Sequence, residues 1–202
     1  MKIIFATVCF LLMLSLAHAE GDVIAGEKKA TVCAACHGKD GNLVSPEWPK
    51  LAGQHAKYLL KQIQAFKKGQ SGGRFNATMT PLVANLSQQD MEDIAAYYAS
   101  QKTTIGKADP KLLKRGQQLY RGGDFSKQIP ACSACHGPAG LGNGEAGFPK
   151  LSGQNAGYIV EELLDYQEGK RTSDINQIMR DITHQMSKDD MVAVASYIQG
   201  LH

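Results

Sequence analysis

The sequence predicts an all-α protein built from two tandem copies of one small domain. Two phrases occur twice, about 100 residues apart: Cys-x-x-Cys-His-Gly at 33–38 and 132–137, and Pro-Lys-Leu-x-Gly-Gln at 49–54 and 149–154. Apolar residues recur with the helical period in both copies, and no segment shows the alternation typical of a strand. Two copies are too few for a solenoid, so we interpret the repeat as a duplicated domain.

Residues 1–19 are predicted to be a secretory signal peptide. Lys2 gives the basic end, 3–16 is nearly all apolar, and Ala17-His18-Ala19 is a cleavage site of the A-x-A type. The apolar run is shorter than the roughly 20 residues that a spanning helix needs, although an uncleaved tether and loose membrane association stay open. Cleavage after Ala19 would remove one of the five cysteines and leave two pairs.

We expect the domains to cover 20–106 and 107–202, because Gly106 and Pro110 punctuate the join. Domains of this size are near the lower limit for independent folding and benefit from a covalent cofactor. The 202 residues are 43% hydrophobic and 20% charged, which argues against disorder. The net charge of +3 is too mild and too evenly spread to indicate a nucleic-acid partner.

Three helices are expected in each copy. The first runs from about Asp22 to the Cys-x-x-Cys-His phrase, and its counterpart starts at about Lys111. The middle helices stop at Gly69 and Gly169, residues that suit the left-handed end of a helix. Each has one apolar face, formed by Tyr58, Leu59, Ile63 and Phe66 in the first copy and by Tyr158, Ile159, Leu163 and Tyr166 in the second.

The last helix of each copy opens with a capping box. Its pattern is Ser87-x-x-Asp90 in the first copy and Ser187-x-x-Asp190 in the second. The apolar stripe that follows is expected to be core, and it consists of Met91, Ile94, Ala95 and Tyr98, repeated as Met191, Val194, Ala195 and Ile198.

The Cys-x-x-Cys-His spacing is the attachment signature of c-type haem. Two thiols three residues apart share a helical face, so both can form thioethers with one haem edge while the histidine reaches the iron. A neutral imidazole nitrogen binds the iron, and the other ring N–H needs an acceptor. The predicted attachment and ligand residues are Cys33, Cys36 and His37, and Cys132, Cys135 and His136.

Three other interpretations of the cysteine pairs were weighed. A zinc ribbon places its two pairs about 15–20 residues apart, much closer than here. Two disulfides suit an exported protein but leave the paired histidines unexplained. A thioredoxin-like redox pair expects a βαβ context, which the sequence lacks.

Met79 and Met179 are the candidate sixth ligands of the iron. They are equivalent in the repeat, are expected in loops, and each follows an asparagine by three residues. The remaining methionines of the mature chain are expected in the cores, at Met91, Met186 and Met191. His184 is the rival in the second domain, but its counterpart is Ala84. His55 is expected to cap a helix or lie at the surface, and the terminal His202 to be exposed.

Ligation by histidine and methionine fills both axial positions and raises the reduction potential relative to two histidines. A closed site of this kind suits outer-sphere electron transfer rather than bond-making at iron. Two alternatives stay open: a dihaem peroxidase, for which no distal His/Glu pair is evident, and an electron-transfer subunit of a larger reductase.

With these motifs, the whole chain after residue 19 resembles the dihaem cytochromes c4, which carry two class I cytochrome c domains in tandem. The resemblance implies two covalently bound haem c groups, a pseudo-twofold domain pair and single-electron carriage in the periplasm. It implies redox proteins as partners, with a quinol-oxidising cytochrome complex as donor and a haem-copper terminal oxidase as acceptor. It implies neither a small-molecule substrate nor a nucleic acid.

The resemblance also assigns residues around each haem. The carbonyls of Pro49 and Pro149 should accept the histidine N–H, and Gly26 and Gly116 should let the first and last helices cross opposite Tyr97 and Tyr197. Trp48 is expected to pack in the first pocket. Leu51 and Leu151 are candidates to pack against the haem face, and Asn76 and Asn176 are candidates in the ligand loops. Arg74 and Arg171 are candidates beside the haem propionates, although these two arginines stand at different offsets from the repeat.

Overall fold

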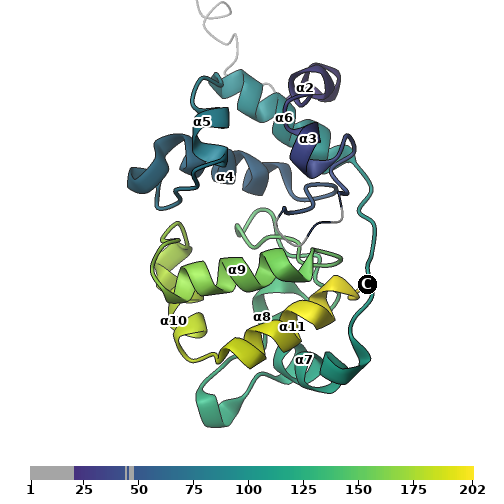
Figure 1. Cartoon of the computed structure of the whole chain (residues 1–202), viewed down its shortest axis with the longest axis vertical. Coiled ribbons are helices and arrows are strands. Elements are labelled where there is room, and N and C mark those ends of the chain that lie inside the picture. The colour runs from purple at the N-terminus through teal and green to yellow at the C-terminus, as the bar shows by residue number, and fades with distance from the viewer. Residues whose placement is uncertain (1–20, 44, 46–47) are drawn as a thin grey trace, which may run out of the picture.

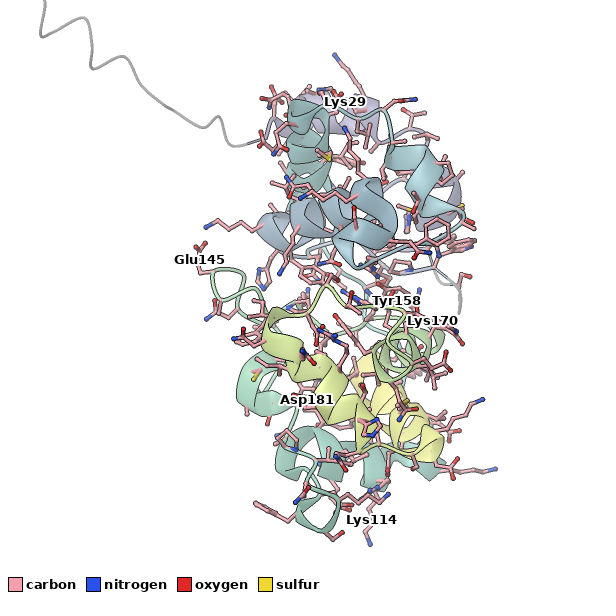
Figure 2. All side chains as sticks on the ribbon, turned by 90° about the vertical axis from the view of Figure 1, so that its left-hand side faces the viewer. Lys29, Lys114, Glu145, Tyr158, Lys170 and Asp181 are labelled. Carbon is pink, nitrogen blue, oxygen red and sulfur yellow. The ribbon has the colours of Figure 1, made fainter. Side chains whose placement is uncertain are left out.

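The computed structural model describes residues 21–202 except 44, 46 and 47. The predicted signal peptide therefore lies outside the described residues. Two helical domains are stacked along the long axis of the molecule, and the chain between them runs down one side (Figure 1). In Figure 2, Lys29 and Lys114 lie at opposite ends, whereas Tyr158 lies in the middle, where the domains meet.

The described residues form helices and no strand, which confirms the predicted all-α class. The first domain contains α2 (Val23–Lys29), α3 (Ala34–His37), α4 (Ala56–Lys68), the 3-10 helix η2 (Gly69–Gly72), α5 (Met79–Val83) and α6 (Gln88–Ser100). The second contains α7 (Pro110–Gly122), η3 (Phe125–Lys127), α8 (Ser133–His136), α9 (Ala156–Gln167), η4 (Ile175–Gln177), α10 (Ile178–His184) and α11 (Lys188–Gln199). In Figure 1, α4 and α9 face each other across the middle of the molecule.

The first helix of each domain is shorter than the sequence predicts. α2 ends at Lys29, and a turn separates it from α3. The prediction of one continuous helix up to the Cys-x-x-Cys-His phrase was therefore wrong. α7 ends where Gly123 takes a φ of +70°, and a small hairpin closed by the Asp124–Ile129 bridge follows. A positive φ is cheap for glycine and ends the helix. The sequence prediction also missed α5 and α10, which are too short to show a period.

The first and last helices of each domain cross at a glycine. A Cβ atom on Gly26 would lie 2.0 Å from the Asp93 carbonyl oxygen of α6, and one on Gly116 would lie 2.2 Å from the Ala193 oxygen of α11. The Cβ atoms of Tyr97 and Tyr197 would also be within 2.8 Å and 2.7 Å. Only glycine permits backbones to approach so closely, so the expected crossing is present in both domains.

The last helices begin with the predicted capping boxes. The Ser87 hydroxyl accepts from the Asp90 N–H at 3.1 Å, and the Asp90 carboxylate accepts from the Ser87 N–H at 2.9 Å. Ser187 and Asp190 form the same reciprocal pair. Each predicted apolar stripe is buried, and it packs against the middle helix of its own domain to form one core per domain.

Across the residues that the structure describes, no helix is both long enough and apolar enough to span a bilayer.

Candidate functional site

The two motif histidines are buried and oriented in the same way. His37 is 4% exposed and His136 is 8% exposed. Each Nδ1 lies 3.0 Å from a proline carbonyl oxygen, of Pro49 for His37 and of Pro149 for His136, so the expected hydrogen bonds are present. If Nδ1–H donates there, Nε2 keeps its lone pair for a metal.

The surroundings of these histidines favour the neutral imidazole. Burial lowers the pKa of His37 and of His136, and the hydrogen bond to proline opposes this only in part. The His37 Nε2 atom is buried and has no hydrogen-bond partner within the described residues. A buried polar atom without a partner is costly. It therefore indicates that this nitrogen is reserved for a group that binds there.

Cys33 and Cys132 are the N-cap residues of the short helices α3 and α8, and Cys36 and Cys135 lie within these helices. No disulfide joins either pair within the described part of the chain. Burial raises the pKa of the Cys33 thiol, and it raises that of Cys132 to about 11. Cys33, Cys132 and Cys135 line one cavity together with both histidines. Sulfur and imidazole are thus presented to one space, as thioether attachment and iron ligation require.

Met79 and Met179 line the same cavity and are partly buried. Both methionines were expected in loops, but both lie in short helices. Met79 begins α5, and Met179 is the second residue of α10. The Asn76 side chain accepts from the N–H groups of Thr78 and Met79, both at 2.9 Å, and so holds the start of α5.

The second methionine is positioned in a different way. Asn176 has a φ of +50° and Gln177 a φ of +62°, two consecutive left-handed residues just before α10. This backbone turn, rather than a side-chain cap, leads into the helix that carries Met179. Both asparagines are exposed, but Asn76 lines the cavity and Asn176 is not among the lining residues.

The rival ligands lie elsewhere. His184 is exposed and lines a separate polar hollow with Arg180 and Asp181. Met91, Met186 and Met191 are core residues, and Met186 also borders the cavity. His55 stands at the N-cap of α4, but its ring nitrogen Nε2 lies 2.8 Å from the Leu141 carbonyl oxygen of the other domain, so its contact is between domains.

The cavity has mainly apolar walls and lies between α4 and α9. The predicted apolar faces of both middle helices line it, together with Trp48, Leu51 and Leu151. Its polar lining includes the imidazoles at the two Cys-x-x-Cys-His phrases and a cluster at the domain boundary. Apolar walls with convergent nitrogen and sulfur ligands fit large, flat, apolar cofactors held through a central metal.

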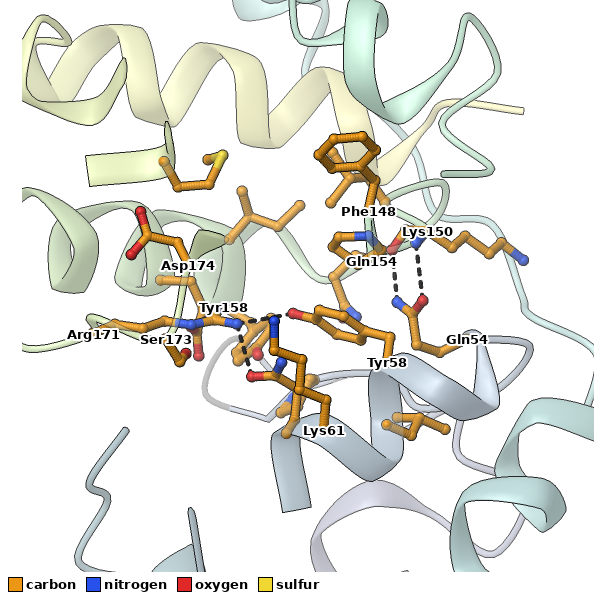
Figure 3. Close-up of a pocket in the computed structure, with 18 of the residues that line it drawn as sticks. Gln54, Tyr58, Lys61, Phe148, Lys150, Gln154, Tyr158, Arg171, Ser173 and Asp174 are labelled. Atoms are coloured by element: carbon orange, nitrogen blue, oxygen red, sulfur yellow. Dashed lines mark hydrogen bonds and ion pairs between the residues drawn. The ribbon is translucent and has the colours of Figure 1, made fainter. Parts of the chain in front are cut away.

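The repeated Pro-Lys-Leu-x-Gly-Gln phrase joins the two domains. The Gln54 side chain accepts from the Lys150 N–H at 2.9 Å and donates to the Lys150 carbonyl at 2.8 Å. Gln154 makes the same two bonds with Lys50, both at 2.8 Å. Figure 3 shows the first of these clamps. They hold the two proline–lysine segments, and hence the histidine acceptors Pro49 and Pro149, against the opposite domain.

The two lysines of these segments bind the chain that links the domains. Lys50 Nζ donates to the Thr104 carbonyl at 2.8 Å, and Lys150 Nζ donates to the Thr103 hydroxyl at 2.7 Å. Burial lowers the pKa of both lysines. The repeated phrase therefore binds the linker between the domains and also joins the domains to each other.

Arg74 and Arg171 are structural counterparts despite their different offsets in the repeat. They pair with each other as an isolated antiparallel bridge, and each guanidinium stacks on an aromatic ring of its own domain. Each also donates to a tyrosine hydroxyl of the other domain: Arg74 to Tyr158 at 2.8 Å and Arg171 to Tyr58 at 2.9 Å. The second of these bonds is visible in Figure 3.

Not every donor at this boundary is satisfied. Arg171 Nε and Ser173 Oγ are buried without a hydrogen-bond partner within the described residues, and both residues line the cavity. Unpaired donors beside an apolar cavity fit a bound group that carries an anionic edge.

Two features of the boundary were not predicted: the clamps formed by Gln54 and Gln154, and Glu162, which ion-pairs with both arginines. The repeat itself contained a signal for the first. Gln54 and Gln154 are repeated although the predicted haem chemistry has no use for them, which indicates a role in joining the copies. Glu162 gave no signal, because its counterpart is Gln62.

Comparison with known proteins gives a consistent result. The family model described as Cytochrome c matches residues 23–102 and 113–202. Cytochrome c4 of Azotobacter vinelandii is 52% identical over 93% of this chain and 92% of its own, and that of Pseudomonas aeruginosa is 50% identical over 100% and 99%. The crystal structure of reduced recombinant cytochrome c4 from Pseudomonas stutzeri matches with a TM-score of 0.87 and 51% identity, covering 90% of this chain and 100% of that one.

The fold and the paired sites define a dihaem c-type electron carrier. The chain belongs to the cytochrome c family and, within it, to the dihaem cytochromes c4. It accordingly carries two covalently bound haem c groups, and its role is to transfer electrons rather than to catalyse a reaction.

Proposed function

We propose that the protein is a periplasmic carrier that takes single electrons from a quinol-oxidising cytochrome complex and passes them towards a haem-copper terminal oxidase. The predicted signal peptide at 1–19 supports export. The similarity to cytochromes c4 over almost the whole chain supports the role of a soluble redox shuttle.

In this proposal His37 and Met79 would bind the first haem iron, and His136 and Met179 would bind the second. The haem supplies the one-electron couple, and the chain fixes its ligands. The observation that carries the proposal is the pair of buried imidazoles, each held through Nδ1 by a proline carbonyl with a methionine on the same cavity. Ligands that are fixed in advance need little rearrangement when the charge of the iron changes.

The same proposal gives the boundary residues a second role. Arg171 has an unpaired Nε and Arg74 lines the same cavity, which supports a role for both guanidinium groups as donors to haem propionates. Leu51 and Leu151 line the cavity as expected of haem-packing residues, and Asn76 holds the helix that carries Met79.

A potentiometric titration of the purified holoprotein, followed by its visible spectrum, tests the ligation. We expect two one-electron steps, a methionine-sulfur-to-iron charge-transfer band from both oxidised haems, and slow binding of cyanide. A high-spin haem in the resting protein, or rapid cyanide binding, would contradict it.

The partners are tested with membranes depleted of soluble cytochromes. Adding the reduced holoprotein should restore oxygen uptake that a terminal-oxidase inhibitor abolishes. Membranes with quinol should reduce the oxidised holoprotein, and an inhibitor of the quinol-oxidising complex should stop this. Reduction that is insensitive to that inhibitor would contradict the proposed donor.

A second candidate donor is a thiosulfate dehydrogenase. A protein of Stutzerimonas stutzeri called thiosulfate dehydrogenase electron acceptor is 39% identical over 83% of this chain and 78% of its own. Reduction of the holoprotein by a purified thiosulfate dehydrogenase, at a rate matching that with quinol and membranes, would favour this donor. The higher identity to cytochromes c4 makes the quinol-oxidising complex the first choice.

A further inference from the structure

A buried charged cluster at the domain boundary departs from the pseudo-twofold symmetry of the molecule. The two arginines, Arg74 and Arg171, contact one residue from each middle helix. Gln62 of α4 accepts from Arg74 at 2.6 Å and from Arg171 at 2.9 Å. Glu162 of α9 occupies the equivalent position and forms an ion pair with each arginine, one through each carboxylate oxygen. The two equivalent positions thus hold different groups, a neutral amide in the first domain and a carboxylate in the second.

The carboxylate is ionised and poorly screened by water. The side chain of Glu162 is 17% exposed, and those of Arg74 and Arg171 are 6% and 5% exposed. Burial alone would raise the pKa of Glu162, but the two guanidinium groups outweigh it and hold the pKa at about 2. The cluster therefore has two positive charges and one negative charge, and the negative charge belongs to the second domain.

We propose that Glu162 makes the two haem environments electrostatically unequal and so biases the distribution of an electron between them. The proposal rests on the proposed function, because it assumes a haem in each pocket. Glu162 acts through the charge of the boundary cluster and has no place among the haem-iron ligands, so it is a positioning residue.

The argument is one of charge and location. A nearby negative charge stabilises the ferric state over the ferrous state, because the oxidised site is more positive by one unit. Buried charges act at longer range than exposed ones, since water and salt screen them less. Glu162 also belongs to α9, whose Ile159 and Leu163 pack in the core of the second domain. The effect of Glu162 should therefore be larger on the second haem than on the first.

The first test compares Glu162→Gln with wild-type holoprotein in a potentiometric titration that resolves the two haems. Both potentials should rise, and the second should rise further. At a fixed applied potential the ferric-to-ferrous ratio of the second haem should fall by about threefold to tenfold, as expected for a partly screened internal charge. Glu162→Asp, which keeps the charge, should restore the wild-type potentials.

The matched control is Glu161→Gln. Glu161 is the adjacent residue of α9 and is exposed, so its replacement removes the same charge from the same helix without touching the cluster. We expect potentials close to those of the wild type. Equal shifts in Glu161→Gln and Glu162→Gln would overturn the proposal, since net charge would then explain both.

The sharpest test moves the carboxylate to the other domain. The double variant Gln62→Glu/Glu162→Gln keeps the composition of the cluster, so the sum of the two potentials should change little while their separation shifts in favour of the second haem. Gln62→Glu alone should lower both potentials, and it tests the proposal even if Glu162→Gln does not fold. Unmoved potentials in these variants would refute the role of Glu162. Loss of the methionine charge-transfer band in the wild type would instead refute the proposed ligation.

Discussion

The two domains fix the same ligands by different local means. In the first, the Asn76 side chain caps the start of α5 and so holds Met79. In the second, two left-handed residues, Asn176 and Gln177, turn the chain into α10 and Met179. Both copies therefore have an asparagine at this position, but the two asparagines act differently. The position of the ligand, rather than the means of holding it, is what the two copies share.

A second difference lies at the outer end of the molecule. Between α7 and the second Cys-x-x-Cys-His phrase, the second domain has a hairpin, 123–129, that the first domain lacks. Asp190 ties it to the core by ion pairs with Lys127 and with Arg115, which also pairs with Asp124. In the first domain the deeply buried acid is Asp93, which ion-pairs with Lys29 of α2. The domains thus differ at their outer ends as well as at their boundary.

The largest effect is expected when one of the two proposed methionine ligands is replaced and the other is kept. Met79→Ala or Met179→Ala should open one iron site, remove about half of the methionine charge-transfer band, and lower the potential of that haem. A fall on the order of 0.2 V is expected, within the ≈ 0.8 V that axial ligands control. The spectrum and a redox titration measure it. An unchanged band in either variant would show that the methionine is not a ligand.

A smaller effect is expected at the helix crossings, which the two domains share. Gly26→Ala and Gly116→Ala each place a Cβ atom against a carbonyl oxygen, so each should destabilise its own domain by about 2–3 kcal/mol. Gly122→Ala is the control, because a Cβ there meets no atom within 4 Å. Thermal unfolding gives the comparison. If all three variants unfold alike, close packing at the crossings is not what requires glycine.

The features that could be predicted from the sequence are those that repeat between the copies or follow the helical period. The three main helices of each domain, the capping boxes at Ser87 and Ser187, and the hydrogen bonds from the histidines to Pro49 and Pro149 are all present. The haem-ligating roles of the motif residues stay predictions. The contacts of Arg74 with the other domain could not be predicted from the sequence: Tyr158 and Glu162 lie more than 80 residues away, and no local pattern records such a pairing.

The weakest expected effect contrasts two equivalent acids, Asp90 and Asp190. Both are capping-box residues, but the side chain of Asp190 is 5% exposed and that of Asp90 is 31% exposed. Burial alone would raise the pKa of Asp190, yet Lys127, Arg115 and Ser187 together hold it below its usual range. Asp190→Asn should therefore cost about 2 kcal/mol of stability at neutral pH, and Asp90→Asn should cost less.

The depressed pKa also fixes how this difference depends on pH. The stabilisation by Asp190 is fully present above the unfolded-state pKa of about 3.9, and it is lost as the pH falls through the lower pKa of the folded state. The gap in unfolding free energy between wild type and Asp190→Asn should therefore be constant near neutrality and narrow below about pH 4. Denaturant unfolding at several pH values, with hydrogen exchange in α11 to locate the change, measures this. A gap that widens in acid would mean that Asp190 is not held as a carboxylate by its cationic neighbours, and that its burial dominates instead.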